Sequence, residues 1–209
     1  MKFPIFASFM IFLGFFYFAT KRAERKHRSN QLSYWEKERQ ANSVRRQPLD
    51  NLDYIVIPYD TLPLTTADTD ELVAQCIREL KELSGETIVN LTGFTNTELK
   101  LQYGAPNITL LSRYDQNFTV LVRILQTWAN RLEELGYPAE ALTVLEFAIR
   151  NRTDVSGSYY LAAKLYVAQG TPEKISYLKR TADTLQSAMR NPIVRTLQES
   201  YPDIDPLHS

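Results

Sequence analysis

The sequence predicts a mainly α-helical fold, a fragment of an α-solenoid whose antiparallel helix pairs follow a transmembrane helix and an extended segment. Three observations support this fold class. Gly136-Tyr137-Pro138 and Gly170-Thr171-Pro172 stand 34 residues apart, and a period of that length is typical of a helix–turn–helix repeat. The run Phe3–Ala19 is almost wholly apolar. Three prolines forbid a continuous helix across Pro48–Leu64.

The repeat extends beyond the two turns. At the same offset Ala129 pairs with Ala163, and Ala148 pairs with Ala182. Glycine commonly ends a helix, and proline is tolerated in the first turn of the next one. Each Gly-x-Pro should therefore join two antiparallel helices.

Length and charge set the limits of this organisation. A chain of 209 residues is long enough for one domain and leaves little room for a second. The formal net charge of zero hides an asymmetry, because residues 21–46 hold nine Lys or Arg against three Glu. A chain that is basic at one end usually contacts something anionic through that end.

The residue types that carry chemistry are scarce. Cys76 is the only cysteine, which excludes an intrachain disulfide and a cysteine-based metal site. His27 and His208 are the only histidines, and both lie in polar or terminal segments. No paired-acid motif, metal-ligand spacing or phosphate-binding loop is present. We therefore expect no enzymatic activity, no cofactor and no metal, although an enzyme of unrecognised class stays as an alternative.

The apolar run predicts a membrane anchor over residues 1–20. Phe3–Ala19 would span about 26 Å as a helix, near the lower limit for crossing a bilayer core. Six phenylalanines recur at every third position from Phe3 to Phe18, so that their rings spiral around the whole helix. A helix that is apolar on every side suits lipid.

The basic residues after the run bear on topology. A cleaved signal peptide is the rival interpretation, but the cluster Lys21–Arg28 is more typical of an uncleaved anchor. By the positive-inside rule the body of a single-pass membrane protein would then lie in the cytoplasm. Lys21–Arg28 would either contact anionic lipid headgroups or act only as a solvated stalk. Nucleic acid is not an expected partner, because no wider basic face or known binding fold accompanies these charges.

One pattern points to the opposite topology. Asn90, Asn107, Asn117 and Asn151 each begin an Asn-x-Thr sequence, the acceptor pattern for N-glycosylation. The alternative function is therefore an envelope or secretory-pathway adaptor or chaperone, with the body outside the cytoplasm.

Helices and connections are expected along the rest of the chain. Asp68 should cap a helix that ends near Gly85 and buries Cys76, and Thr95 should cap a short helix through Tyr103. Asn117 should cap a helix over Phe118–Leu135. The predicted division is a transmembrane anchor (1–20), a basic juxtamembrane helix or stalk (21–46), an extended segment plus a helix packing on the repeats (47–116), and a helical domain with a C-terminal cap helix (117–209).

The part over residues 121–187 resembles the tetratricopeptide repeat family. The best match is Leu135-Gly136-Tyr137-Pro138-Ala139-Glu140-Ala141-Leu142, followed by Leu145 and Ala148. The second unit departs from the family pattern, with Ile175 and Lys179 in place of a small residue and an aromatic, and Thr153 where a proline is usual.

The resemblance implies a groove that binds a protein or peptide partner. The positions expected to face it are Arg123, Gln126, Asn130, Glu133, Tyr160 and Lys164. The alternative is that they form only the solvated side of amphipathic helices. Chaperone-tail binding is disfavoured, because Asn130 alone lies where a carboxylate clamp needs it. The predicted function is a non-catalytic, membrane-anchored scaffold or adaptor, with Leu49–Leu64 lying in or beside its groove.

Overall fold

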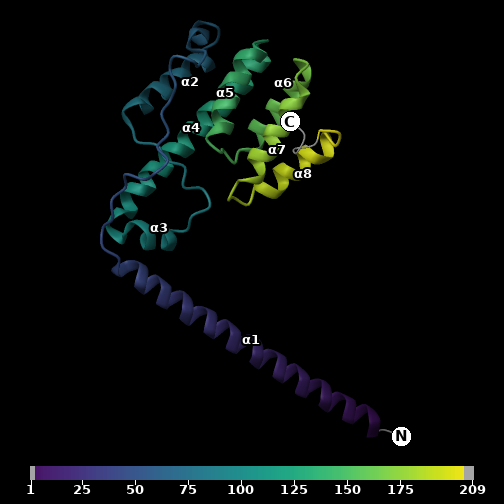
Figure 1. Cartoon of the computed structure of the whole chain (residues 1–209). Helices are drawn as coiled ribbons and strands as arrows, with labels where there is room; N and C mark the ends of the chain where they lie inside the picture. Colours follow the sequence, from purple (N-terminus) through teal and green to yellow (C-terminus); the bar gives the residue numbers. More distant parts are fainter. Residues whose placement is uncertain (1–2, 205–209) are drawn as a thin grey trace. The chain divides into compact units, whose positions relative to one another are not determined.

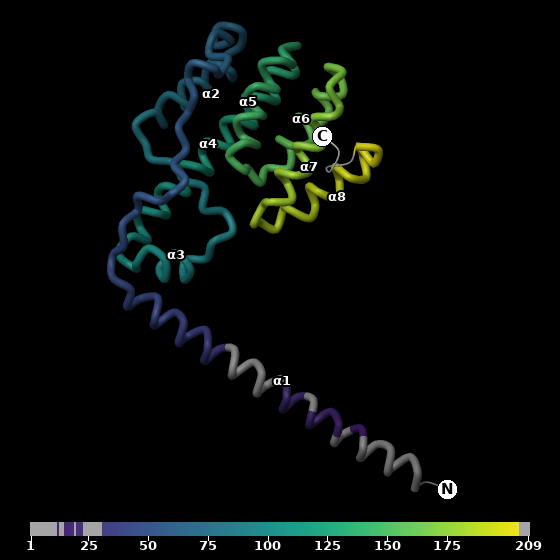
Figure 2. Tube along the Cα trace, viewed as in Figure 1, coloured from purple at the N-terminus to yellow at the C-terminus, as the bar shows by residue number. Residues whose placement is uncertain are grey.

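The computed structural model describes the backbone of residues 3–204, with the side chains of that range other than residues 3–11, 13, 14, 19 and 23–30 (Figure 1, Figure 2). The predicted mainly helical class is confirmed, and an antiparallel bridge between Tyr54 and Val89 is the one β pairing of the described residues. The chain forms two compact units. The first unit comprises residues 1–47 and 96–108, and the second unit comprises residues 48–95 and 109–209.

The first unit is built from a long helix and a short one. Helix α1 (Phe3–Ser43) and helix α3 (Asn96–Tyr103) pack together. Glu38 of α1 accepts hydrogen bonds from Lys100 and from the Thr97 hydroxyl of α3, and this pairing lowers the pKa of Glu38. Because α3 ends at Tyr103, the short helix expected here is confirmed.

Gly104 and Asn107 close the first unit. Gly104 has a φ of 89°, and a Cβ at this position would collide with the Arg45 carbonyl. The Asn107 amide donates to the carbonyl oxygens of Gln47 and Tyr103, at 2.8 Å each. The chain segment after α1 is therefore tied to the end of α3 by the side chain of Asn107.

The structure corrects the prediction of a membrane-spanning helix. Among the residues described, none of the helices contains a stretch both long and apolar enough to cross a bilayer. The predicted span Phe3–Ala19 reaches only the lower limit of length, and α1 continues through exposed Thr20 and Lys21 into a basic segment. The predictions of a single-pass membrane protein and of a membrane location are corrected by this finding. Most side chains of the span and of Lys21–Arg28 lie outside those described.

The second unit contains six helices around one hydrophobic core. Neighbouring helices pack in succession from α5 to α8 (Figure 1). Ala129, Ala148, Ala163 and Ala182, the small residues of the sequence repeat, are each at most 1% exposed. Small side chains allow helices to approach closely. The six helices are α2 (Glu71–Glu82), α4 (Ile108–Glu134), α5 (Pro138–Arg150), α6 (Ser156–Ala168), α7 (Ile175–Asp183) and α8 (Arg190–Ser200).

The turns after α4 and α6 have the same geometry. Gly136 has a φ of 84°, and its N–H donates to the Glu133 carbonyl at 3.1 Å, while the Tyr137 N–H donates to Leu132 at 2.9 Å. This is the Schellman arrangement, which satisfies the last carbonyls of a helix. The same two bonds recur around Gly170, whose φ is 72°. Both turns predicted from Gly-x-Pro are therefore helix ends.

Helix α4 begins earlier than predicted. It starts at Ile108 rather than Phe118, because nothing between Pro106 and Gly136 interrupts a helix. Asn117, the expected cap, lies inside α4, and its amide donates to the Thr87 carbonyl at 2.9 Å.

The segment Leu49–Leu64 is extended over residues 53–58, has turns on either side of them, and serves as a core element. Ile57 and Leu62 belong to the hydrophobic core, and the Tyr59 hydroxyl donates to the Leu80 carbonyl of α2 at 2.8 Å. The Ile55 N–H donates to the Ile88 carbonyl at 3.0 Å.

Asp70, rather than the predicted Asp68, caps α2. Its Oδ1 accepts from the N–H groups of Leu72 and Val73, at 2.9 and 3.3 Å. Arg131 of α4 donates to both carboxylate oxygens, from Nε at 3.1 Å and from Nη2 at 2.8 Å. The Arg131 guanidinium, with help from these backbone donors, lowers the pKa of Asp70 to about 2. One carboxylate therefore ends α2 and joins it to α4.

The Asp70–Arg131 pair predicts a specific acid sensitivity. Because the folded-state pKa of Asp70 is depressed, its contribution to stability is complete above the usual carboxyl pKa and is lost as pH falls from about 4 towards 2. Asp70→Asn keeps a capping side chain but removes this titration. The Tm of the wild type should exceed that of Asp70→Asn at pH 6 and converge with it near pH 2. A Tm difference independent of pH would contradict the assignment.

Lys179 explains one departure from the repeat pattern. This lysine of α7 is only 4% exposed, and its ammonium donates to the carbonyl oxygens of Tyr201 and Ile204, at 2.6 Å each. Carbonyls at a helix C-terminus carry partial negative charge. Lys179 thus fastens the residues after α8, the expected cap helix, to α7.

Lys179→Met should therefore destabilise the second unit by about 2–3 kcal/mol, the usual range for charge-assisted hydrogen bonds in a buried setting. Urea unfolding measures the change, and limited proteolysis should show faster cleavage after α8. Lys81→Met, at an exposed position of α2, is the matched control and should change stability by less than about 0.5 kcal/mol. Equal effects of the two substitutions would contradict the assigned role.

Candidate functional site

A strip of polar side chains runs along the outer side of α4. Arg123, Gln126, Thr127 and Asn130 recur at the helical spacing that places residues on one face. We call these four residues the α4 face. The Arg123 side chain is 68% exposed, whereas Gln126 and Thr127 are half-buried.

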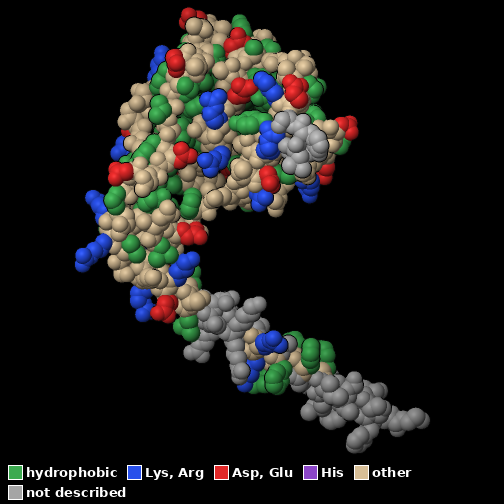
Figure 3. Space-filling model, in the orientation of Figure 1, with side chains coloured by type: hydrophobic (Ala, Val, Ile, Leu, Met, Phe, Trp, Pro, Cys, Tyr) green, Lys and Arg blue, Asp and Glu red, His purple; other side chains and the backbone are tan. Residues whose placement is uncertain are grey.

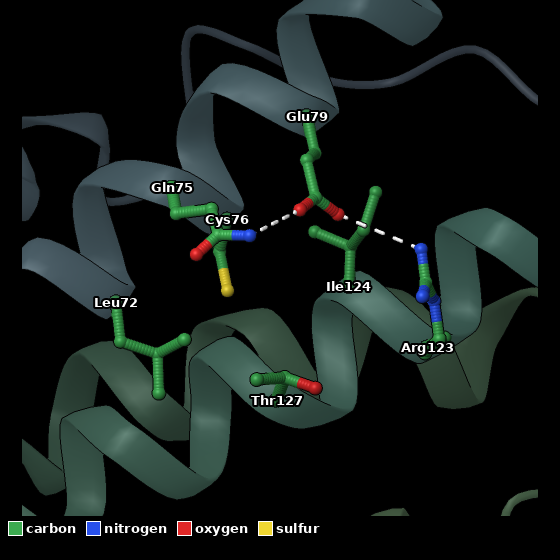
Figure 4. Close-up of a pocket in the computed structure, with 7 residues that line it drawn as sticks. All are labelled: Leu72, Gln75, Cys76, Glu79, Arg123, Ile124 and Thr127. Atoms are coloured by element: carbon green, nitrogen blue, oxygen red, sulfur yellow. Dashed lines mark hydrogen bonds and ion pairs between the residues drawn. The ribbon is translucent and has the colours of Figure 1, made fainter.

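The first hollow lies between α2 and the α4 face and has a volume of about 150 Å³. Figure 4 shows side chains from both helices around it, with Gln75 hydrogen-bonded to Glu79 and Glu79 ion-paired to Arg123. The Glu79–Arg123 distance of 3.6 Å and the exposure of Arg123 make this a weak pair. The lining residues are Leu72, Gln75, Cys76, Glu79, Arg123, Ile124 and Thr127.

The second hollow lies on the other side of the α4 face and has a volume of about 340 Å³. Phe118 and Val122 line it and are 2% and 6% exposed, so its floor is apolar. Threonines, Gln126, Asp154 and Val155 supply the remaining lining. Arg123 and Thr127 line both hollows, so the two hollows flank one strip of α4.

The structure brings four of the predicted groove residues together in pairs. The Gln126 amide donates to Asn130 Oδ1 at 2.7 Å, and Gln126 Oε1 accepts from the Ser158 hydroxyl at 2.6 Å. Lys164 of α6 donates to Glu133 at 2.7 Å. The polar sides of α4 and α6 thus face each other.

The other two predicted residues differ. Arg123 contacts Glu79 on α2, away from the α6 residues. Tyr160 is half-buried and packs against the hydrophobic core. Sequence reasoning missed Thr127, which helical spacing from Arg123 would have found. A helix from residues 47–116 was expected to pack on the repeats, but the α2 residues that line the first hollow were not identified from the sequence, because only tertiary packing decides which of them face α4.

The Asn-x-Thr asparagines have structural roles. Each of the four amide nitrogens donates to at least one backbone carbonyl: Asn90 to Asn151 and Arg152, Asn107 to Gln47 and Tyr103, Asn117 to Thr87, and Asn151 to Phe147. An N-linked glycan is attached at this same nitrogen. In the folded protein these amides therefore hold loops and helix ends in place.

The thiol of Cys76, which lines the first hollow, is not poised for reaction. Burial, followed by the nearby Glu79 charge, raises the pKa of Cys76 to about 11, and the thiol is 4% exposed. Within the described residues, His, Cys, Asp and Glu nowhere gather in groups of three that could hold a metal. What the hollows offer a ligand is hydrogen-bonding side chains above an apolar floor.

Comparison of the chain with protein-family models, curated proteins and solved structures returns no match. The function is therefore argued from the geometry of the site itself.

The environment of Cys76 predicts slow thiol chemistry. A pKa near 11 instead of 9.0 lowers the thiolate fraction about 100-fold, and the thiolate is the reactive form. At pH 8 the folded protein should react with Ellman's reagent at least about 100-fold more slowly than the urea-unfolded chain. The unfolded chain, which should release one thiol equivalent, is the control. Equal rates would show that Cys76 is accessible and ionised.

Proposed function

We propose that the second unit is a peptide-binding module and that the chain acts as a non-catalytic interaction scaffold. In this proposal its helix pairs are of the tetratricopeptide type. The 34-residue spacing, the identical turns after α4 and α6, and the buried alanines support the comparison. The observation that carries the function is the pair of hollows that share Arg123 and Thr127.

The shape of the site suits a chain more than a compact ligand. Pockets for small molecules usually enclose about 300–1,000 Å³ and bury most of the ligand. The first hollow, at about 150 Å³, is below this range, and the second, at about 340 Å³, is at its lower end; the two lie on either side of one exposed helix face. A peptide crossing that face would reach both hollows at once. Gln126, Asn130 and Thr127 would meet its backbone amide groups.

The charges of the site suggest what the peptide carries. Arg123 is exposed and its contact to Glu79 is long, so its guanidinium is available to an acidic side chain. An apolar side chain of the peptide would fill the larger hollow above Phe118 and Val122. On the side seen in Figure 3, acidic and basic side chains are interspersed over the second unit.

The test is selection of a displayed peptide library on the full chain. Selected peptides should contain an Asp or Glu close to an apolar residue. Arg123→Glu should weaken the binding of such a peptide at least about tenfold, which corresponds to the loss of one charge-assisted contact. Arg195→Glu, on an exposed position of α8, is the control and should bind as the wild type does.

A charge-swapped peptide makes the test decisive. Replacing the acidic residue of the peptide by Lys should restore binding to Arg123→Glu and weaken binding to the wild type. Thr127→Trp should block both hollows for either peptide. If peptides bind Arg123→Glu and Thr127→Trp as well as the wild type, the α4 face is not the binding site.

A further inference from the structure

A third hollow lies between α5, α6 and α7 and shares no residue with the other two. Its volume is about 260 Å³, and it is lined by Glu146, Arg150, Tyr166, Lys174 and Tyr177. We call it the tyrosine pocket. The volume is just below the usual range for small-molecule sites, so a ligand that fits it is small.

Existing contacts occupy one carboxylate oxygen of the pocket. Glu146 Oε1 accepts the Tyr166 hydroxyl at 2.8 Å and lies 3.8 Å from the Lys174 ammonium. The Lys174 ammonium is also 5.3 Å from the centre of the Tyr166 ring. Burial, followed by the hydrogen bond to Glu146, raises the pKa of Tyr166, so its phenol stays neutral at physiological pH.

Arg150 is the basic residue of the pocket that takes no part in these contacts. It lies in the last turn of α5 with an exposed side chain, and the described residues offer its guanidinium no ion-pair partner. With Arg150 and Lys174 positive and Glu146 negative, the lining carries one net positive charge. A planar guanidinium binds a carboxylate through two parallel hydrogen bonds.

The aromatic lining defines the rest of the ligand. Tyr177 is 38% exposed and lines the pocket together with Tyr166. The interaction free energy of two stacked aromatic rings exceeds what their buried area alone contributes. A flat ring bearing an acidic group would therefore contact Tyr177 and Arg150 together.

We propose that the tyrosine pocket binds a small aromatic monocarboxylate through Arg150 and Tyr177. A single negative charge matches the single net positive charge of the lining. A phosphate monoester carries about −1.5 to −2 at pH 7, and it would leave excess negative charge beside Glu146. The carboxylate belongs either to a free acid or to the C-terminal aromatic residue of a peptide, which share this chemistry.

Ligand-observed fluorine NMR with fluorophenylacetate and the full chain tests the proposal. The probe should bind the wild type, and Arg150→Gln should weaken its affinity at least about tenfold. Arg150→Lys keeps the positive charge but loses the two parallel hydrogen bonds of the guanidinium, so its affinity for the probe should lie between those of the wild type and Arg150→Gln. Tyr177→Ala should also weaken the binding of the probe. Arg195→Gln is the matched control at an exposed arginine and should bind as the wild type does.

Two further probes fix the ligand class. Phenyl phosphate should displace fluorophenylacetate less well than phenylacetate does. Displacement by N-acetyl-alanyl-phenylalanine at lower concentration than phenylacetate would assign the site to a peptide C-terminus, and the reverse order would assign it to a free acid. Absence of probe binding, unchanged binding in Arg150→Gln, or stronger displacement by phenyl phosphate would each overturn the proposal.

Discussion

The second unit depends on the burial of α4 between its neighbours. Leu121, Leu125, Trp128 and Leu132 recur along one side of this helix and are each at most 1% exposed. The indole N–H of Trp128 is buried without a hydrogen-bond partner among the described atoms, which costs about 1–3 kcal/mol. Burial of so large a ring offsets that cost. Because this side is committed to the core, the opposite side of α4 is left to face solvent and to form the site.

Much of the fold could be predicted where local chemistry decides it. Gly136 and Gly170 end their helices because each must adopt a positive φ, which glycine tolerates. The start of α4 could not be predicted this way. Asn117 has the chemistry of a cap, but its amide instead binds the carbonyl of Thr87, a partner 30 residues away. A side chain that serves a local role and one that serves a distant role look the same in the sequence.

In the candidate site, too, the features set by local sequence could be predicted and those set by distant contacts could not. Helical spacing placed Arg123, Gln126 and Asn130 on one face, since this needs only the period of α4. Tyr160 has the same kind of spacing but packs against the core, because the angle at which α6 meets its neighbours decides which of its residues are covered. The wall that α2 supplies is packed into the core and joined to α4 by the Asp70–Arg131 pair, whose residues lie 61 positions apart. No local pattern reports such a pair.

The ammonium of Lys179 imposes an order on the assembly of the second unit. Its two carbonyl acceptors lie 22 and 25 residues further along the chain. During synthesis α7 is complete well before those acceptors exist, and docking α7 earlier would bury the ammonium without them. Burying a charge that lacks its hydrogen bonds is unfavourable. The packing of α7 on the core is therefore coupled energetically to the docking of residues 201–204.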